Sequence, residues 1–259
     1  MYVGYNLKLN LDKNDQIIRD YYKIGKKIYD NKKNLVKEKL DSFILNDGSL
    51  DGTKMQNNWF PQIKSDIFLS HSHKDEVIAI ALAGLFKEIS GLELFIDSCI
   101  WGYSNNLLKN IDDRYCYDVI KETYNYESRN YSTSHVHMML STALTMMIDK
   151  TECLFFLNTP NSITASQLIN ETESPWIYSE IAMAKMIRKK QPHEHREFYK
   201  SKSFVLKEHF KVKYELNVNH LIPLSSKILC DWIDSGFSDP YDALDKLYGK
   251  TNIIRETYE

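Results

Sequence analysis

Ser65-Asp-Ile-Phe-Leu-Ser70 is a short apolar run that ends in a polar residue, a pattern typical of a buried strand. Residues 77–89 then repeat apolar side chains at helical spacing, and Leu92-Glu-Leu-Phe-Ile-Asp97 is a second strand-like run. A strand, a helix and a strand in this order form one βαβ unit, in which the two strands are parallel. Residues 65–97 therefore predict the start of an α/β sheet.

The same alternation continues toward the C-terminus. Glu152-Cys-Leu-Phe-Phe-Leu-Asn158 predicts a third strand, and the pattern at 174–190 predicts a helix. Two shorter strand candidates are 203–206 and 220–223. Between the second and third strands, the long connection at 98–151 predicts two helices, the second at 134–148. Strands that alternate with helices predict a parallel sheet in three layers, covered by helices on both faces.

The N-terminal region has a different pattern. Apolar residues recur at helical spacing over 12–46, with lysines between them, and predict one or two helices. The polar segment 46–53 holds two of the nine glycines and interrupts this pattern. We therefore expect an N-terminal helical extension at 1–60, followed by the α/β domain with a C-terminal helical tail at 61–259.

The composition excludes several classes of protein. Of the 259 residues, 43% are hydrophobic and 26% are charged, so the bulk of the chain is not disordered. A formal net charge of -2 gives no electrostatic basis for wrapping nucleic acid or binding an anionic membrane. The longest apolar run, 77–86, is half of a bilayer span, and the first residues lack a secretory signal pattern. We expect a soluble cytoplasmic protein that binds neither nucleic acid nor membrane.

The cysteines and glycines argue against further kinds of binding site. The four cysteines are far apart and form no Cys-x-x-Cys pair, which argues against a disulfide framework or a cysteine zinc site. Neither of the glycine-rich loop patterns that cradle phosphates occurs in the chain.

In parallel sheets of this kind, ligands bind at the carboxyl ends of the strands. Polar residues follow the predicted strands at these ends. Ser70, His71 and Ser72 follow the first strand, and Asp97 and Trp101 follow the second.

A third candidate segment is the helix start at Ser174-Pro-Trp-Ile-Tyr-Ser-Glu180. Ser174 is a good N-cap and Pro175 suits the first helical turn. Trp176 and Glu180 are four residues apart and so are neighbours on one helix face, where they could hold a flat cationic ring and a ribose. The alternative is that Glu180 is only a surface acid on an amphipathic helix.

These three segments together resemble a Toll/interleukin-receptor (TIR) domain. Asp66-Ile-Phe-Leu-Ser-His-Ser-His-Lys-Asp75, Leu94-Phe-Ile-Asp97 with Trp101, and Ser174-Pro-Trp-Ile-Tyr-Ser-Glu180 stand in the family's order and spacing. The resemblance covers about residues 62–235. It implies a flavodoxin-like fold and, in the bacterial branch of the family, cleavage of NAD by a glutamate at the position of Glu180. The N-terminal extension and the long connection at 98–151 depart from the family's minimal pattern.

The resemblance also implies roles for other residues and for partners. Glu180 would be the catalytic carboxylate of an NAD nucleosidase or ADP-ribosyl cyclase. Candidates for binding NAD, which is a substrate and not a cofactor, are Ser70, His71, Ser72, Asp97, Trp101 and Trp176. No metal is required. Small bacterial TIR proteins resemble the signal-producing subunit of Thoeris anti-phage systems, which implies a diffusible nucleotide messenger, a separate effector protein, a phage-derived trigger and a homo-oligomer.

Two other functions remain open. TIR domains also act as non-catalytic adaptors that bind other TIR domains. His71-Ser-His73-Lys-Asp75 resembles the metal motif of metallo-β-lactamase-like hydrolases, although the position after Asp75 holds Glu76 and not histidine. His135 and His137 begin the helix of the long connection, and we consider them candidates for the acceptor side of the NAD pocket.

Overall fold

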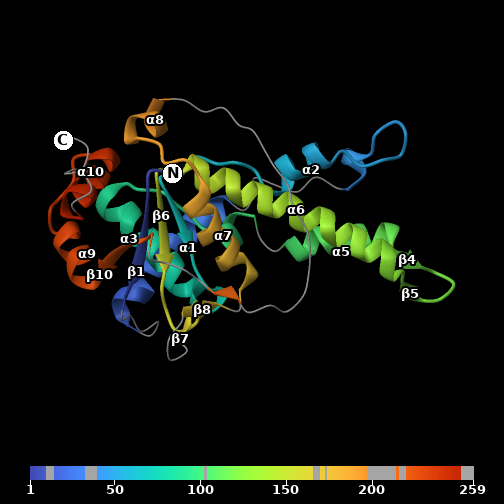
Figure 1. Cartoon of the computed structure of the whole chain (residues 1–259), viewed down its shortest axis with the longest axis horizontal. Helices are drawn as coiled ribbons and strands as arrows, with labels where there is room; N and C mark the ends of the chain where they lie inside the picture. The colour runs from blue at the N-terminus through green and yellow to red at the C-terminus, as the bar shows by residue number, and fades with distance from the viewer. Residues whose placement is uncertain are drawn as a thin grey trace.

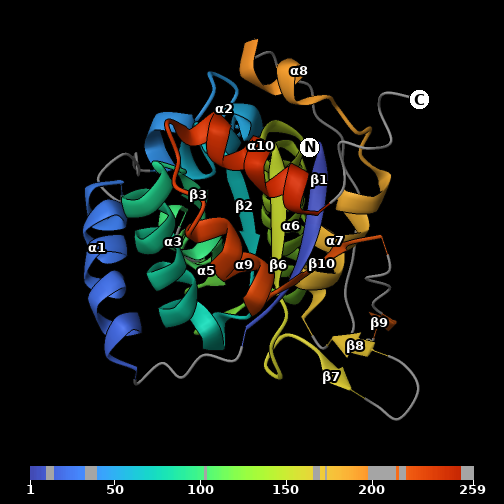
Figure 2. The same ribbon diagram turned by 90° about the vertical axis from the view of Figure 1, so that its left-hand side faces the viewer.

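The computed structural model describes most of the chain: residues 1–9, 15–32, 40–101, 104–165, 170–172, 174–197, 214–215 and 220–251. At its centre is a parallel sheet of five strands in the order β10-β1-β6-β2-β3, with helices on both faces (Figures 1 and 2). The strands are β1 (Val3–Lys8), β2 (Ile67–Ser70), β3 (Leu94–Phe95), β6 (Cys153–Leu157) and β10 (Ile222–Ser225). The predicted α/β class is confirmed, and the sheet is compatible with a flavodoxin-like fold.

Most of the predicted strands are present. The apolar runs at 65–70, 92–97 and 152–158 correspond to β2, β3 and β6, and the candidate at 220–223 corresponds to β10, which begins two residues later. Every residue of β2 and β6 is buried, as expected for central strands that have helices on both faces. The candidate at 203–206 lies outside the described residues.

The N-terminus departs from the expectation of a purely helical extension. Helices α1 (Gln16–Lys32) and α2 (Gly52–Trp59) are present, but Val3–Lys8 forms β1 and pairs with β6 on one side and β10 on the other. The helical prediction is therefore wrong for these residues, and a boundary at residue 60 would divide one sheet. The strand was hidden because Gly4 and Asn6 are residue types depleted in strands.

The helices form one layer on each face of the sheet. On one face, α1 packs on α3 (Glu76–Ser90), and α9 (Ser226–Ile233) packs on α3 through the rings of Phe86 and Trp232, whose centroids are 5.3 Å apart. In Figure 2 α3, α9 and α10 lie in front of the sheet and α6 lies behind it. Within the described part of the chain, no helix combines the length and the apolar composition that crossing a bilayer requires.

The long connection between β3 and β6 contains the two predicted helices and more. The second helix, α6 (Tyr126–Lys150), begins eight residues before the predicted start at 134. Its first two turns were missed because they are largely exposed and carry no apolar stripe; Asn125 caps them by accepting a hydrogen bond from the Ser128 amide. Ahead of it lie α4 (Asp97–Ile100), α5 (Ser104–Tyr115) and a hairpin of β4 (Tyr117–Asp118) and β5 (Thr123–Tyr124).

The remaining described elements are short, apart from α7 and α10. They are η2 (Leu40–Phe43), η3 (His73–Asp75), β7 (Thr164–Ala165), β8 (Asn170–Thr172), α7 (Pro175–Met186), α8 (Pro192–Glu197), β9 (Tyr214–Glu215) and α10 (Pro240–Lys250).

The order of the strands determines where a ligand site is expected. The chain leaves β2 for β3 on one side, whereas it leaves β6 for β10 on the other side. Because β2 and β6 are neighbours, the direction of the connections reverses between their carboxyl ends. In open parallel sheets, ligands bind in the crevice at such a reversal.

Candidate active site

Two polar side chains at the carboxyl end of β2 each have a buried atom without a hydrogen-bond partner among the described residues. Ser70 is the last residue of the strand, and its Oγ is buried and lacks a hydrogen-bond partner among the described residues. The next residue, His71, is 8% exposed; its Nδ1 lies 3.4 Å from the Leu69 carbonyl oxygen, and its Nε2 is buried without a partner in the described part of the chain. Buried polar atoms are rarely left unsatisfied, so both atoms are candidates for contact with a ligand.

Helix α7 brings a carboxylate to the same place. Ser174 caps the helix by accepting a hydrogen bond from the Ile177 amide, and Pro175 lies in the first turn, as predicted. Ile177 and Ile181 are buried in the core, and Glu180 is turned inward with them. Glu180 is only 4% exposed, so the interpretation of this residue as a surface acid is wrong.

The surroundings of Glu180 disfavour its charged form. Burial raises the pKa of the Glu180 carboxyl well above its usual value, and the negative charge of Asp97 raises this pKa further. The Ser70 hydroxyl lies near enough to oppose the shift and lower the pKa, although its Oγ forms no hydrogen bond among the described residues. Ser70 is therefore a neighbour of the carboxylate and not its hydrogen-bond donor.

Asp97 lies near both Glu180 and His71, and its charge affects the pKa of each side chain. It is the first residue of α4, directly after β3, and is half-buried. Burial lowers the pKa of the His71 imidazole more than the charge of Asp97 raises it, so His71 is neutral at neutral pH. We call Ser70, His71, Asp97 and Glu180 the polar cluster.

The two candidate histidines of α6 point in different directions. The His137 imidazole lies against the half-buried Trp176 indole of α7, with ring centroids 5.5 Å apart and planes at 88°. His135 is exposed and its ring lies 4.5 Å from that of Tyr131. Residues two apart in a helix lie on different faces, so only His137 is near α7.

Two of the predicted NAD-binding residues, Trp101 and Ser72, make hydrogen bonds within the protein. Trp101 is 2% exposed, its indole Nε1 donates to the Pro61 carbonyl at 3.0 Å, and its ring packs on Phe95 at 4.8 Å. Trp101 therefore belongs to the hydrophobic core. Ser72 caps η3, where its Oγ accepts a 3.4 Å hydrogen bond from the Lys74 amide.

Sequence reasoning missed a link between the loops that follow β2 and β6. Asp75 is 4% exposed and accepts hydrogen bonds from Thr159 Oγ1 at 2.5 Å and Asn161 Nδ2 at 2.7 Å. This link holds the loop that carries His71 against the neighbouring strand's loop. The sequence does contain an indication of this link, because Thr159 and Asn161 come just after the third predicted strand and Ser70 comes at the end of the first.

The histidines of the His-x-His motif do not converge. The centroids of the His71 and His73 rings are 6.2 Å apart, and His73 is exposed. No group of three or more His, Cys, Asp or Glu side chains that could hold a metal ion exists among the described residues.

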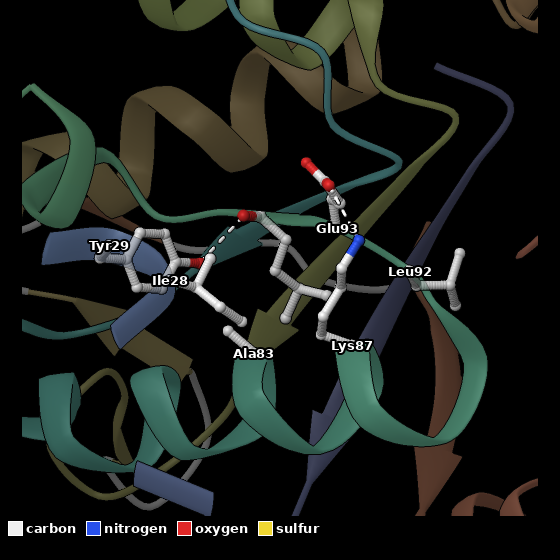
Figure 3. A pocket seen from close by; sticks show the side chains of 7 residues that line it. Ile28, Tyr29, Ala83, Lys87, Leu92 and Glu93 are labelled. Carbon is white, nitrogen blue, oxygen red and sulfur yellow. Dashed lines mark hydrogen bonds and ion pairs between the residues drawn. The ribbon is translucent and has the colours of Figure 1, made fainter. Parts of the chain in front are cut away.

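A small cavity lies away from the polar cluster, between α1, α3 and the start of β3 (Figure 3). It has room for about one water molecule. Beside it, the Tyr29 hydroxyl donates to the Leu94 carbonyl at 2.9 Å. The cavity is lined by Ile28, Tyr29, Ala83, Lys87, Leu92, Glu93 and Leu94.

Comparison of the chain with models of protein families, with curated proteins and with solved structures finds no significant match.

Proposed function

We propose that this chain is a TIR-type enzyme that cleaves the nicotinamide–ribose bond of NAD, with Glu180 as the catalytic carboxylate. The observation that carries the proposal is the burial of Glu180 at the carboxyl end of β2, beside Ser70 and Asp97. A buried carboxylate without an ion-pair partner in the described part of the chain is costly, and such groups gather at functional sites. The order of the three TIR-like segments in the sequence supports the same assignment.

The charge of the polar cluster suits the reactive end of NAD. The charge of Asp97 creates a negative potential that attracts the positively charged nicotinamide ring. The bound cation in turn lowers the pKa of Glu180 and favours its carboxylate form. Trp176, on the same helix as Glu180, offers an aromatic face to a flat or cationic ring. The unbonded Ser70 Oγ and His71 Nε2 are available for hydrogen bonds to the nucleotide.

The reaction needs only one carboxylate. The bond between C1′ of the ribose and the pyridinium nitrogen breaks, and its electron pair leaves with nicotinamide as a neutral base. No acid has to protonate this leaving group, in contrast to the oxygen leaving groups of most glycosidases. The Glu180 carboxylate stabilises the oxocarbenium-like transition state and can accept hydrogen bonds from the ribose hydroxyls. Addition of water at C1′ releases one proton and gives ADP-ribose.

The product is proposed to be a signal. Attack by a group of the same molecule would give a cyclic ADP-ribose isomer, and attack by an external imidazole would give a histidine conjugate. The resemblance to the signal-producing subunit of Thoeris systems supports a role in anti-phage defence, in which the nucleotide activates a separate effector after a phage-derived trigger.

Mass spectrometry of NAD incubated with the purified protein tests the proposal. We expect nicotinamide and one ADP-ribose-derived product, whose mass distinguishes hydrolysis, cyclisation and conjugation when free histidine is present or absent. The Glu180→Gln variant should form neither. Glu88→Gln, which changes an exposed glutamate of α3, is the matched control and should retain activity. If the wild type remains inactive in lysate from phage-infected cells as well, the protein is an adaptor and not an enzyme.

A further inference from the structure

The exposed apolar side chains are concentrated in one segment. Helix α5, the β4–β5 hairpin and the start of α6 extend away from the sheet as an arm (Figure 1). We call residues 115–131 the arm tip. More than half of the exposed large hydrophobic side chains in the described part of the chain belong to it: Tyr115, Tyr117, Val119, Ile120, Tyr124, Tyr126 and Tyr131.

The apex of the arm tip is unusually apolar for a surface turn. Val119 is 78% exposed and Ile120 is 95% exposed, and both lie in the turn between β4 and β5. Tyr126 and Tyr131 are 78% and 70% exposed. Isolated exposed apolar residues are common, but a concentration of them marks an interaction surface, and tyrosine is enriched in protein interfaces.

The arm tip is held in a fixed shape by a buried polar network at its base. Asp112 is 4% exposed and accepts hydrogen bonds from Arg129 Nε at 3.0 Å and from the Ser132 hydroxyl, which ties α5 to α6. The rings of Tyr117 and Tyr124 pack edge to face across the hairpin, 5.2 Å apart. A preorganised surface loses little conformational entropy on binding, so this network favours a docking role.

Charge and area both indicate the occupant of this surface. The arm tip carries acidic groups at Asp118, Glu122 and Glu127 and basic groups at Lys121 and Arg129. The apex from Asp118 to Glu122 holds two acidic groups and one basic group. Its net negative charge disfavours an anionic membrane, and mixed charge is complementary to a copy of itself. The exposed side chains offer on the order of 600–800 Å² per copy, close to the contribution of each partner in a standard interface.

We propose that the arm tips of two copies of this chain pack against each other about a two-fold axis and form a homodimer. In such an isologous contact each tip presents the same patch, with Val119 and Ile120 near the axis and the tyrosines around them. The strands β4 and β5 pair only with each other among the described strands, so each has an outer edge on which the hairpin of the second copy can pair.

Sedimentation velocity over a wide range of protein concentration tests this proposal without reference to NAD. The wild type should show a concentration-dependent dimer. Ile120→Asp places two like charges near the axis and should raise the dimer dissociation constant at least about tenfold. Ile17→Asp changes a 61% exposed isoleucine of α1 in the same way and should leave the dissociation constant unchanged.

The same three proteins provide controls for correct folding and for binding to a partner other than a second copy. At a protein concentration at which all three proteins are monomeric, circular dichroism melting should be the same for both variants and the wild type, because both isoleucines are exposed in the single chain. A wild type that stays monomeric at all concentrations would overturn the proposal, and so would an Ile120→Asp variant that dimerises as strongly as the wild type. Binding of a monomeric wild type to phosphatidylcholine vesicles would identify a lipid surface as the occupant instead.

Discussion

Glu180 is the residue on which both the stability and the proposed chemistry depend. Because its pKa is raised in the folded protein, the folded state binds the proton more tightly than the unfolded state does. The contribution of this proton to the free energy of unfolding is fully present below the usual carboxyl pKa. It is lost as the pH rises through the raised pKa of the folded protein. Each unit of pKa shift corresponds to about 1.4 kcal/mol.

The first prediction follows from this linkage. The free energy of unfolding of the wild type should fall relative to that of Glu180→Gln as the pH rises above the usual glutamate pKa of 4.5. Near neutral pH, where a charged Glu180 would be buried, the glutamine variant should be the more stable of the two. Urea unfolding across the pH range measures the difference. A difference independent of pH would mean that Glu180 is exposed to solvent in solution.

A second prediction distinguishes the roles of the two histidines of α6. His137→Ala removes the ring that packs on Trp176, and such aromatic pairs contribute about 0.5–1.5 kcal/mol. The KM of NAD cleavage should therefore rise about two- to tenfold. His135→Ala, on the exposed face, should change neither KM nor the ratio of products. Equal effects of the two variants on KM and on the ratio of products would mean that neither histidine lies at the acceptor side of the NAD pocket.

At the scale of elements, α1 and α3 cross with their backbones in close approach. A Cβ atom on Gly84 would lie 2.1 Å from the Tyr21 carbonyl oxygen, and one on Gly25 would lie 2.0 Å from the Ile80 carbonyl oxygen. Gly84→Ala should therefore force the helices apart and lower the free energy of unfolding by about 1–3 kcal/mol or more. Gly249→Ala, in α10, has open space around it and should be neutral or stabilising by up to about 1 kcal/mol. Urea unfolding of both variants checks the contrast.

A buried ion pair joins α8 to the residue before β6 and to α10. Glu152 is 4% exposed and accepts hydrogen bonds from Arg196 at 2.9 and 3.2 Å and from the Tyr248 hydroxyl at 2.8 Å. Arg196 also pairs with Asp245 at 3.0 Å.

The fourth prediction concerns this pair. Arg196→Met would leave a buried carboxylate without its cation and should cost about 3–5 kcal/mol in the free energy of unfolding. Arg188→Met, which breaks the more exposed pair with Glu194, should cost less than about 1 kcal/mol. Similar costs for the two variants, measured by urea unfolding, would show that Glu152 is accessible to water.

At the scale of the whole molecule, the central strands could be predicted because they are continuous apolar runs, such as Phe155 and its neighbours in β6. Strand β1 could not, because it holds a glycine and an asparagine, and only its pairing with β6 and β10 identifies it. Of the candidate site, Ser70 and Asp97 were predicted from their positions at strand ends, and Glu180 from the resemblance to a TIR domain. The burial of Trp101 and the bonds of Asp75 depend on contacts between distant segments, which sequence periodicity does not contain.

The rate of nicotinamide release from NAD, compared between the wild type and Glu180→Gln, tests the central claim most directly. The substitution preserves the shape of the side chain and removes its charge, and the urea unfolding described above establishes that the variant is folded. The proposed mechanism predicts a loss of at least about a hundredfold in rate, the cost of removing one group that stabilises the charge of the transition state. Equal rates of nicotinamide release by the two proteins would contradict the assignment of Glu180 as the catalytic carboxylate.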